Sequence, residues 1–445
     1  MGVHEGPGQA SPHWRAPAAT GPVHARVTVP GSKSVTNRAL VLAALADGPG
    51  TIGSPLHSRD TLLMRRALAA LGAGIDDSDP ACWRVSPGQP PGDVRVDVGN
   101  AGTVMRFVPP VASLTAAAVE FHGDTRASQR PVAPILAALR ELGAVIDDGG
   151  RGAVPFTVRG SGSLAGGVVT LDASASSQLV SGMLLAAPRY GKGVEVRHRG
   201  PRAPSAAHID MTVAMLREAG ASVETWSAGG QAGAGGPDTW RVHPGPVEPR
   251  AAAVQPDLVN AVPFLAAALV TGGTVTIAGW PAATTQPASQ IIELLTSLGG
   301  RCELTAGGLT VTGTGVIHGI AADLADVNET ALVATALAAL ADAPSRLTGI
   351  GHMRRHETDR LAAIATEIGA LGGDVTQLPD GLAVRPRPLA AGARPFASYD
   401  DHRLVMAAAV LGLAVPGIEV ADPATVGKTF PEFTQRWASM LECPP

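Results

Sequence analysis

The stretch Ile135-Leu-Ala-Ala-Leu-Arg-Glu-Leu-Gly143 decides the fold, because its pattern returns along the whole chain. Apolar residues at helical spacing predict a helix, and the closing glycine is typical of a helix C-cap that precedes a strand. Similar runs recur roughly every 70–80 residues, a repeat too long for most solenoids. They lie at 67–72, 215–220, 291–299 and 361–372, and a helix over 437–441 fits the start of a last copy. About six copies of one α/β unit fit the 445 residues.

The copies are expected to fall into two groups of three. The proline-rich stretch His243-Pro-Gly-Pro-Val-Glu-Pro-Arg250 marks one boundary, and a second crossing is placed just before Pro30. Residues 30–252 then form an inserted domain, and residues 21–29 with 253–445 form a discontinuous one. We expect residues 1–20 to be a disordered leader, because they are rich in Gly, Pro and Ala and lack the apolar segment of a signal peptide.

The composition is that of an Ala/Gly-rich globular protein, and it excludes several classes of partner. Only 3% of the residues are aromatic and the net charge is −4, so neither a base-stacking surface nor a basic footprint for nucleic acid is expected. The longest apolar runs, such as 404–415, are too short to cross a membrane. Cys82, Cys302 and Cys443 lie far apart without metal-ligand spacing, which favours a reducing, cytoplasmic location and no metal site.

The first of several polar clusters is Gly31-Ser-Lys-Ser-Val-Thr-Asn-Arg-Ala39, which follows an alternating apolar run and a Pro30-Gly31 turn. The unpaired N–H groups at a helix start attract anions, and Lys33 and Arg38 add two full charges. A nucleotide-binding P-loop requires a glycine directly before the lysine, where this chain has Ser32. The stretch therefore suits a phosphate or carboxylate, although a helix cap with two solvated basic residues fits equally well.

Further polar clusters also stand where helices are expected to begin. They are Val98–Arg106, Gly123–Pro131, Ala173–Leu179, Ala325–Thr330, His352–Arg360, Tyr399–Arg403 and Val426–Pro431. Each alone reads equally well as a cap, a turn or a solvated face. If the copies are arranged alike, however, the clusters converge on one cleft, whose field would concentrate an anionic ligand. The cations of this expected ring are Lys33, Arg38, Arg130, Arg360, Arg403 and Lys428.

Two carboxylates inside such a ring, Glu329 and Glu357, imply proton transfer rather than binding alone. Glu329 enters an Ala-rich apolar helix, so we expect burial to raise its pKa toward that of a useful base. The plainer reading is a glutamate near a helix N-terminus that favours the helix dipole.

Taken together and in order, the motifs resemble the family of 5-enolpyruvylshikimate-3-phosphate synthases over about residues 23–437. The motifs that carry the resemblance are Gly31–Arg38, Gly99–Thr103, Arg130-Pro131, Ser176–Gln178, His356–Arg360, Tyr399–Arg403 and Lys428–Pro431. The resemblance implies an α/β fold of two similar domains, each of three βαβαββ units, joined by two crossover strands. It places the active site between domains that close on small-molecule substrates, and it implies no cofactor and no metal.

The resemblance also implies the site residues. Shikimate 3-phosphate is expected on Lys33, Ser34, Arg38, Ser176, Ser177, Gln178, Ser205, Glu329 and His356. Phosphoenolpyruvate is expected on Lys33, Asn100, Gly102, Arg130, Gln178, Arg360, Arg403 and Lys428. The implied reaction is an addition followed by an elimination, in which the 5-hydroxyl attacks C2 of phosphoenolpyruvate and phosphate leaves. Glu329 takes the hydroxyl proton, Glu357, with Lys428, protonates the methylene carbon, and Lys33 contacts both substrates.

Departures from the family pattern keep alternatives open. The family often has Asp at position 329, Tyr at His208 and Pro at Phe107, which leaves room for a paralogue acting on a related phosphorylated ring substrate. The UDP-N-acetylglucosamine enolpyruvyl transferases usually carry a cysteine in a mobile loop, and His122–Arg130 has none. A non-catalytic anion-binding protein of the same fold would not require the two carboxylates. We expect a cytoplasmic monomer with no nucleic-acid or membrane partner.

Overall fold

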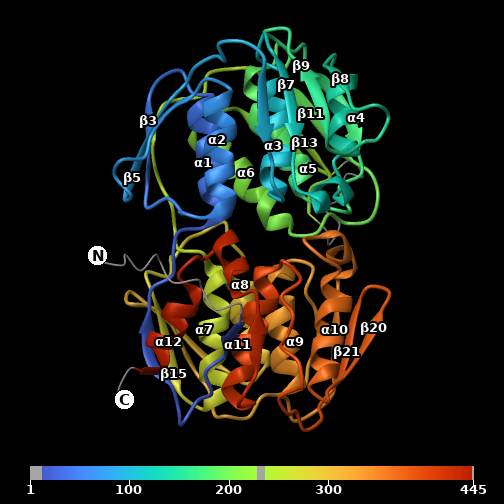
Figure 1. Ribbon diagram of the computed structural model, residues 1–445. Coiled ribbons are helices and arrows are strands. Elements are labelled where there is room, and N and C mark those ends of the chain that lie inside the picture. The colour runs from blue at the N-terminus through green and yellow to red at the C-terminus, as the bar shows by residue number, and fades with distance from the viewer. Residues whose placement is uncertain (1–12, 228–235, 443–445) are drawn as a thin grey trace, which may run out of the picture.

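The computed structural model has two lobes of similar architecture, stacked one above the other (Figure 1). It describes residues 13–227 and 236–442. Residues 1–12 of the expected leader, residues 228–235 and Cys443 lie outside the described residues. Within the part that is described, no helix is both long enough and apolar enough to span a membrane.

The first lobe, the upper one in Figure 1, contains three four-stranded sheets. Its strands are β3 (Gly50–Gly53), β4 (Gly74–Asp76), β5 (Cys82–Ser86), β6 (Val94–Asp97), β7 (Ala118–His122), β8 (Val145–Asp147), β9 (Phe156–Arg159), β10 (Gly167–Leu171), β11 (Val194–His198), β12 (Val223–Trp226), β13 (Thr239–Val242) and β14 (Ala251–Ala253). Its helices are α1 (Lys33–Ala44), α2 (Arg59–Ala70), α3 (Gly102–Ala112), α4 (Ala133–Glu141), α5 (Gln178–Ala186) and α6 (Ala206–Glu218), with the 3-10 turns η1 (Thr125–Gln129) and η2 (Ala187–Arg189).

The second lobe repeats this plan in two four-stranded sheets and has the two-stranded sheet β1-β22 in place of the third. Its strands are β1 (His13–Arg15), β2 (His24–Val27), β15 (Thr274–Ala278), β16 (Arg301–Thr305), β17 (Gly308–Thr312), β18 (Ala321–Asp323), β19 (Ser345–Thr348), β20 (Asp374–Leu378), β21 (Gly381–Arg385) and β22 (Glu419–Ala421). Its helices are α7 (Leu258–Thr271), α8 (Ala288–Ser297), α9 (Ala331–Ala339), α10 (Arg360–Ala370), α11 (His402–Ala414) and α12 (Phe433–Glu442), with the 3-10 turns η3 (Asn328–Thr330), η4 (Gly351–Arg355) and η5 (Pro423–Lys428).

One sheet topology explains the repeat in the sequence. In the sheet β6-β7-β9-β8, β7 is parallel to β6 and antiparallel to β9, and β8 pairs with β9. Helix α3 connects the parallel pair and α4 precedes the closing hairpin, which gives the order βαβαββ. The sheets β10-β11-β13-β12 and β18-β19-β21-β20 have the same order. The expected α/β fold of two similar domains built from βαβαββ units is confirmed.

Each lobe has its own hydrophobic core. One core contains buried residues between positions 39 and 254, and the other joins residues 16–29 to residues 258–440. The helices at the centre of the second lobe are buried nearly all round, as α11 shows from His402 to Leu413. A helix that is apolar on every side belongs in the middle of a core, whereas α10 and α12 pack one apolar face against it and turn a polar face outward.

The expectation of a disordered leader is wrong for residues 13–20. His13 and Arg15 of β1 pair antiparallel with Ala421 and Glu419 of β22, and Ala16 is 2% exposed. β1 thus covers an edge of β22 whose backbone groups would otherwise lack a strand partner. Composition alone does not reveal a strand that pairs with a segment so distant in sequence.

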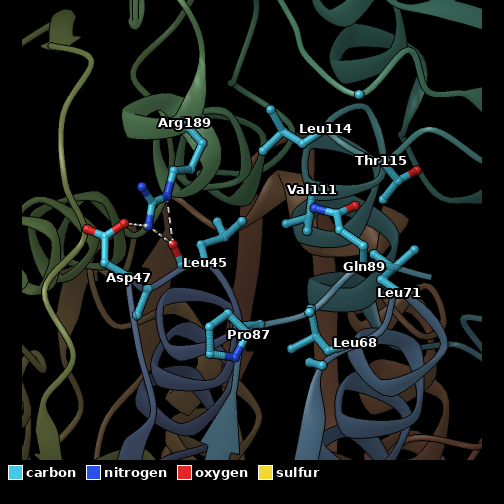
Figure 2. A pocket seen from close by; sticks show the side chains of 15 residues that line it. Leu45, Asp47, Leu68, Leu71, Pro87, Gln89, Val111, Leu114, Thr115 and Arg189 are labelled. Carbon is cyan, nitrogen blue, oxygen red and sulfur yellow. Dashed lines mark hydrogen bonds and ion pairs between the residues drawn. The ribbon is translucent and has the colours of Figure 1, made fainter. Parts of the chain in front are cut away.

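A cavity of about 480 Å³ opens at the far end of the first lobe, where α1, α2 and α3 end (Figure 2). Apolar side chains such as Leu68 and Val111 line it, and Arg189 at its rim pairs with Asp47 at 2.7 Å. In the second lobe, residues 16–23 cover the corresponding helix ends, and Ala19 donates its N–H to the last turn of α11. The polar clusters lie at the opposite ends of these helices, so this cavity is not where they meet.

The packing of β1 and Ala16 against α11 predicts that alanine substitutions at two helical glycines change stability in opposite directions. A Cβ at Gly412 of α11 would stand 2.6 Å from the Cβ of Ala16, whereas a Cβ at Gly369 of α10 meets nothing within 4 Å. Gly369→Ala should therefore raise the free energy of unfolding by about 0.5–1 kcal/mol through helix propensity. Gly412→Ala should lower it by about 1–3 kcal/mol through overpacking. Urea unfolding measures both, and equal stabilisation would contradict the described position of Ala16.

Candidate active site

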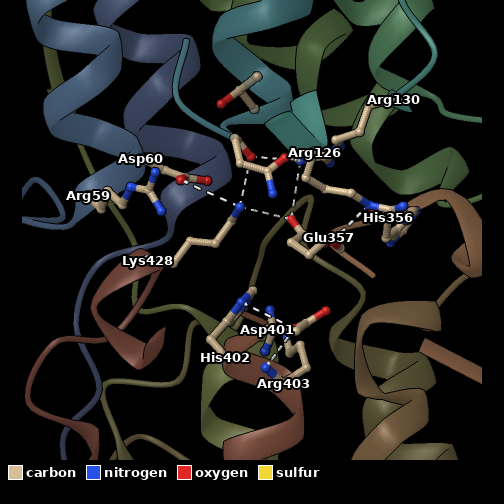
Figure 3. Close-up of polar contacts among 12 residues, drawn as sticks. Arg59, Asp60, Arg126, Arg130, His356, Glu357, Asp401, His402, Arg403 and Lys428 are labelled. Atoms are coloured by element: carbon tan, nitrogen blue, oxygen red, sulfur yellow. Dashed lines mark hydrogen bonds and ion pairs between the residues drawn. The ribbon is translucent and has the colours of Figure 1, made fainter. Parts of the chain in front are cut away.

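The polar clusters meet between the lobes, as the sequence predicts. Helices α1, α3 and α5 begin there with Lys33, Gly102 and Gln178, and α10 begins there with Arg360. Figure 3 shows residues of both lobes directed into this region, with Asp60 and Arg130 above and Arg403 and Lys428 below. Several helix starts are capped by side chains, which fixes the residues that follow them.

Glu357 lies at the centre of the site and is only 7% exposed. Its carboxylate is 3.1 Å from Lys428 Nζ, 3.0 Å from Arg360 Nη2 and 3.5 Å from Arg130 Nη1. Burial disfavours the charged form, but Lys428, Arg130 and Arg360 outweigh it and hold the pKa of Glu357 well below its ordinary value. Because Arg130 belongs to the first lobe and the other two cations to the second, this carboxylate joins the lobes.

Asp60 is a site residue that the sequence reasoning missed. It lies in the first turn of α2, where Ser58 and Thr61 form a capping box, so its position resembles an ordinary helix start. In the structure its carboxylate is 2% exposed, 3.3 Å from Lys33 Nζ and 3.8 Å from Lys428 Nζ. Burial by itself lowers the pKa of Lys33, but Asp60 and the more distant Glu329 and Glu357 raise it above its ordinary value.

A second buried pair orients the arginines of the second lobe. Asp401 accepts two hydrogen bonds from Arg360, at 2.6 and 3.1 Å, and caps α11 through the N–H of Arg403. Arg403 in turn reaches Asn260 Oδ1 at 2.9 Å and Glu329 at 3.2 Å. Such a bidentate pair fixes the plane of a guanidinium and leaves its remaining donors directed into the site.

The expectation that burial raises the pKa of Glu329 is wrong. Burial does act in that direction, but Arg403, His208 and Lys33 outweigh it and lower the pKa of Glu329 to about 2. The residue belongs to the 3-10 turn η3 before α9, and its side chain is 27% exposed. The cations that surround it could not be assigned to this carboxylate from its own stretch of sequence.

Gly102 stands where three polar side chains crowd the start of α3. A Cβ at this position would lie 2.8 Å from both Arg106 and Arg130 and 2.9 Å from Gln178 Oε1. Arg106, which the sequence analysis did not select, donates to Gln178 at 2.7 Å. Asn100 accepts from Arg130 at its backbone and side-chain oxygens, and its backbone oxygen also accepts from Lys428 at 2.8 Å. The glycine therefore leaves space for two donors and one acceptor that converge from three parts of the first lobe.

Arg38 is a buried cation held by neutral acceptors. It is 1% exposed and donates to Thr212 Oγ1, Ser181 Oγ and the backbone oxygens of Ser34 and His208. Its guanidinium lies 5.1 Å from the centroid of the Phe107 ring, a cation–π contact. Burial lowers the pKa of Arg38 to about 9, despite the opposing effect of Glu329. A cation in this position favours an anionic or hydroxylated ligand beside it.

The remaining predicted residues come from both lobes. Ser176 and Ser177 precede α5, and Ser177 is 4% exposed. Ser205 adopts a left-handed backbone with φ of 51° before α6 and accepts a hydrogen bond from Asn328 of the other lobe at 2.6 Å. His356 contacts Arg360 at 3.1 Å, and burial together with that arginine holds its pKa well below the ordinary value. His208 is likewise desolvated, which lowers its pKa to about 4.

A cavity of about 620 Å³ opens from the site to the surface between the lobes. Glu357, Lys428 and Asn100 form its inner wall, and Arg59, Arg126 and Tyr399 lie among its outer residues. Within residues 13–227 and 236–442, no group of three or more His, Cys, Asp or Glu is placed to hold a metal ion. The surrounding cations fit phosphate and carboxylate groups, and the carboxylates among them fit proton transfer.

Comparisons with known proteins agree on one family. A model of that family, described as EPSP synthase (3-phosphoshikimate 1-carboxyvinyltransferase), matches residues 17–437. The solved EPSP synthase from Acinetobacter baumannii is 25% identical over 96% of this chain and 97% of its own, with a TM-score of 0.77. A second structure of that enzyme matches this chain with a TM-score of 0.76. The enolpyruvyl transferase NikO from Streptomyces tendae is 17% identical over 95% of this chain and 96% of its own, with a TM-score of 0.72, and shares the fold.

The contacts of Asp60 predict that it supports both lysines. Asp60→Asn should lower kcat/KM by about 10- to 100-fold, the equivalent of about 1.5–3 kcal/mol of charge-assisted hydrogen bonding. Because Asp60 raises the pKa of Lys33, its neutralisation lowers that pKa. Protonated Lys33 is then lost at a lower pH, so the alkaline limb of the kcat/KM profile should move to lower pH. Glu303→Gln on the exposed face of β16 serves as the control, and an unmoved alkaline limb in Asp60→Asn would contradict the assignment.

Proposed function

The chain belongs to the EPSP synthase family, and we propose that Glu329, Glu357, Lys33 and Lys428 perform its chemistry. The protein is a transferase that moves the enolpyruvyl group of phosphoenolpyruvate to the 5-hydroxyl of shikimate 3-phosphate and releases phosphate, a reaction of aromatic amino-acid biosynthesis. The observation that carries the assignment of roles is the enclosure of Glu357 by Arg130, Arg360 and Lys428. Three cations around one carboxylate can bind an anionic substrate while the carboxylate exchanges a proton with it.

Shikimate 3-phosphate is proposed to lie on the side of α1, α5 and α6. The hydroxyls of Ser176 and Ser177, together with the amide of Gln178, stand at the start of α5, where backbone N–H groups favour a phosphate. Ser34, Arg38 and Ser205, with His356 from the other lobe, would orient the ring hydroxyls. Arg38 is buried and donates only to neutral acceptors, which supports this placement.

Phosphoenolpyruvate is proposed to lie between Gly102 and the second lobe. Arg130, Arg360, Arg403 and Lys428 offer charged donors there, and Gln178 and Asn100 lie beside them. Planar guanidinium groups fit carboxylate and phosphate oxygens bidentately, which would hold both ends of the substrate. Lys33, near the start of α1, is proposed to contact both substrates.

The proton transfers require that the pKa values of the two carboxylates change when substrate binds. In the free protein, cations hold the pKa of Glu329 at about 2 and that of Glu357 well below its ordinary value. Substrate phosphates and carboxylate would neutralise these cations, so both pKa values should rise. Glu329 then accepts the 5-hydroxyl proton as the oxygen attacks C2. Glu357 delivers a proton to the methylene carbon, which becomes a methyl group. Phosphate then leaves as Glu357 takes a proton back from that methyl group, which restores the double bond, and the proton held by Glu329 leaves with the phosphate.

Of the alternatives that the sequence left open, the family match favours the shikimate 3-phosphate enzyme over a non-catalytic protein or another enolpyruvyl transferase. The likeness to NikO concerns the fold alone. The family binds small-molecule substrates. We further propose that the protein acts as a cytoplasmic monomer, with the domain boundaries given by the sequence, 30–252 and 21–29 with 253–445, except that residues 13–20 join the second domain. The placement of site residues from both lobes of one chain supports the monomer.

Glu329→Gln tests the general base. The substitution keeps the shape and hydrogen bonding of the side chain but removes the proton acceptor, so turnover should fall by about 10²–10⁴-fold. Shikimate 3-phosphate should still bind within roughly tenfold of the parent. Asp326→Asn, three residues earlier in a partly exposed pair with Arg202, is the matched control. Steady-state kinetics and calorimetry measure both quantities, and turnover within about threefold of the parent would remove Glu329 from the mechanism.

Proton uptake on binding tests the proposed pKa changes. A group whose pKa rises on binding takes up a proton where the pH lies above its old pKa and near or below its new one. The complex with shikimate 3-phosphate and phospholactate, a saturated analogue that cannot react, should therefore take up more protons at about pH 5.5 than at about pH 8. Calorimetry in buffers of different ionisation enthalpy measures this uptake. Glu357→Gln controls for protons lost by the ligand phosphates, and identical uptake by parent and variant would refute the change at Glu357.

A further inference from the structure

We infer that Arg126 is a positioning residue that holds the segment carrying Glu357 in place when the two lobes meet. The inference deepens the proposed function, because it rests on the role proposed for Glu357. Arg126 belongs to η1 of the first lobe, whereas His356 and Glu357 precede α10 of the second lobe. Figure 3 shows the Arg126 side chain lying beside these two residues.

The contacts are made to the backbone rather than to a side chain. Arg126 Nε donates to the carbonyl oxygens of Glu357 at 3.0 Å and His356 at 3.3 Å, and Nη2 donates to the His356 oxygen at 3.2 Å. The planar guanidinium offers donors in a fixed fork, which suits two adjacent carbonyl groups. Hydrogen bonds from a charged donor are also about twice as strong as neutral ones. One side chain therefore holds the two peptide groups that flank the Cα of Glu357.

Arg126 is oriented by its own turn. Its Nη1 donates to Gln129 Oε1 at 2.5 Å, and the neighbouring Ala127 is fully buried. Arg130, which ends the same turn, approaches the carboxylate of Glu357 at 3.5 Å. The turn η1 thus contacts Glu357 twice, at the backbone through Arg126 and at the carboxylate through Arg130.

The segment that Arg126 holds has little regular structure of its own. His356 follows η4, α10 starts only at Arg360, and the residues between them form bends. The position of the Glu357 backbone determines where its carboxylate lies relative to the substrate. A misplacement of about 1 Å at a reacting group can cost about 10²-fold in rate. Since the support comes from the other lobe, the acid is in place only when the lobes are together.

Two variants separate this role from general adhesion between the lobes. Arg126→Gln removes the forked donor, and Arg202→Gln removes another arginine that bridges the lobes. Arg202 Nη2 pairs with Asp326 at 3.0 and 2.9 Å, away from the segment that carries Glu357. Each variant is examined as the full chain for turnover, for calorimetric binding of shikimate 3-phosphate, and for compaction on substrate binding by small-angle X-ray scattering. Arg126→Lys, which keeps one charged donor, is the conservative variant.

We expect Arg126→Gln to lower kcat by about 10- to 100-fold, with shikimate 3-phosphate affinity and compaction within about threefold of the parent. Arg202→Gln should keep kcat within about threefold, and Arg126→Lys should restore part of the loss. Parent-like kcat in Arg126→Gln overturns the inference, and so does an equal loss in both glutamine variants. Turnover of Glu357→Gln separates the two proposals. If that variant is inactive while Arg126→Gln is parent-like, only the positioning role fails, whereas a fully active Glu357→Gln refutes the proposed acid.

Discussion

The structure depends on one buried arrangement of charge, the carboxylate of Glu357 between Arg130, Arg360 and Lys428. Cations removed from water at this density destabilise a fold unless carboxylates lie among them. Asp60 and Asp401 act in the same way for Lys33 and Arg360. Because members of the network belong to different lobes, their pairing is complete only when the lobes are in contact. The buried cations are therefore fully paired with carboxylates only in the arrangement that also closes the site.

This constraint also accounts for the class of ligand. The carboxylates of Glu329 and Glu357 are ionised in the free protein because their neighbours are cations, and the same cations remain available to phosphate and carboxylate groups. An anionic substrate pairs with some of these cations in place of the carboxylates, and the carboxylates can then accept and donate protons. Binding and chemistry are coupled through the same charges, and no separate acid or base with a raised pKa in the free protein is required.

The repeated unit explains why so many charged residues reach one place. Each βαβαββ unit directs the start of an inner helix toward the other lobe, as α1, α3 and α5 do in the first lobe. The unpaired N–H groups at these starts favour anions. The far ends of the helices are closed differently in the two lobes. Residues 16–23 cover them in the second lobe, while a cavity beside Arg189 and Asp47 remains in the first.

The sequence by itself determined the repeat, the two-domain α/β fold and the polar stretches at the helix starts, because helical spacing, C-cap glycines and charged turns are local properties. Only the tertiary structure decided which charges are neighbours. Asp60 has the local features of an ordinary helix-start residue, and only the fold places Lys33 and Lys428 beside it. Burial acts to raise the pKa of Glu329, but Arg403, which the fold places next to it, lowers that pKa. The pairing of β1 with β22 was hidden for the same reason. Coulomb interactions and strand pairing depend on distance in space, and residues hundreds of positions apart carry no local signal of their proximity.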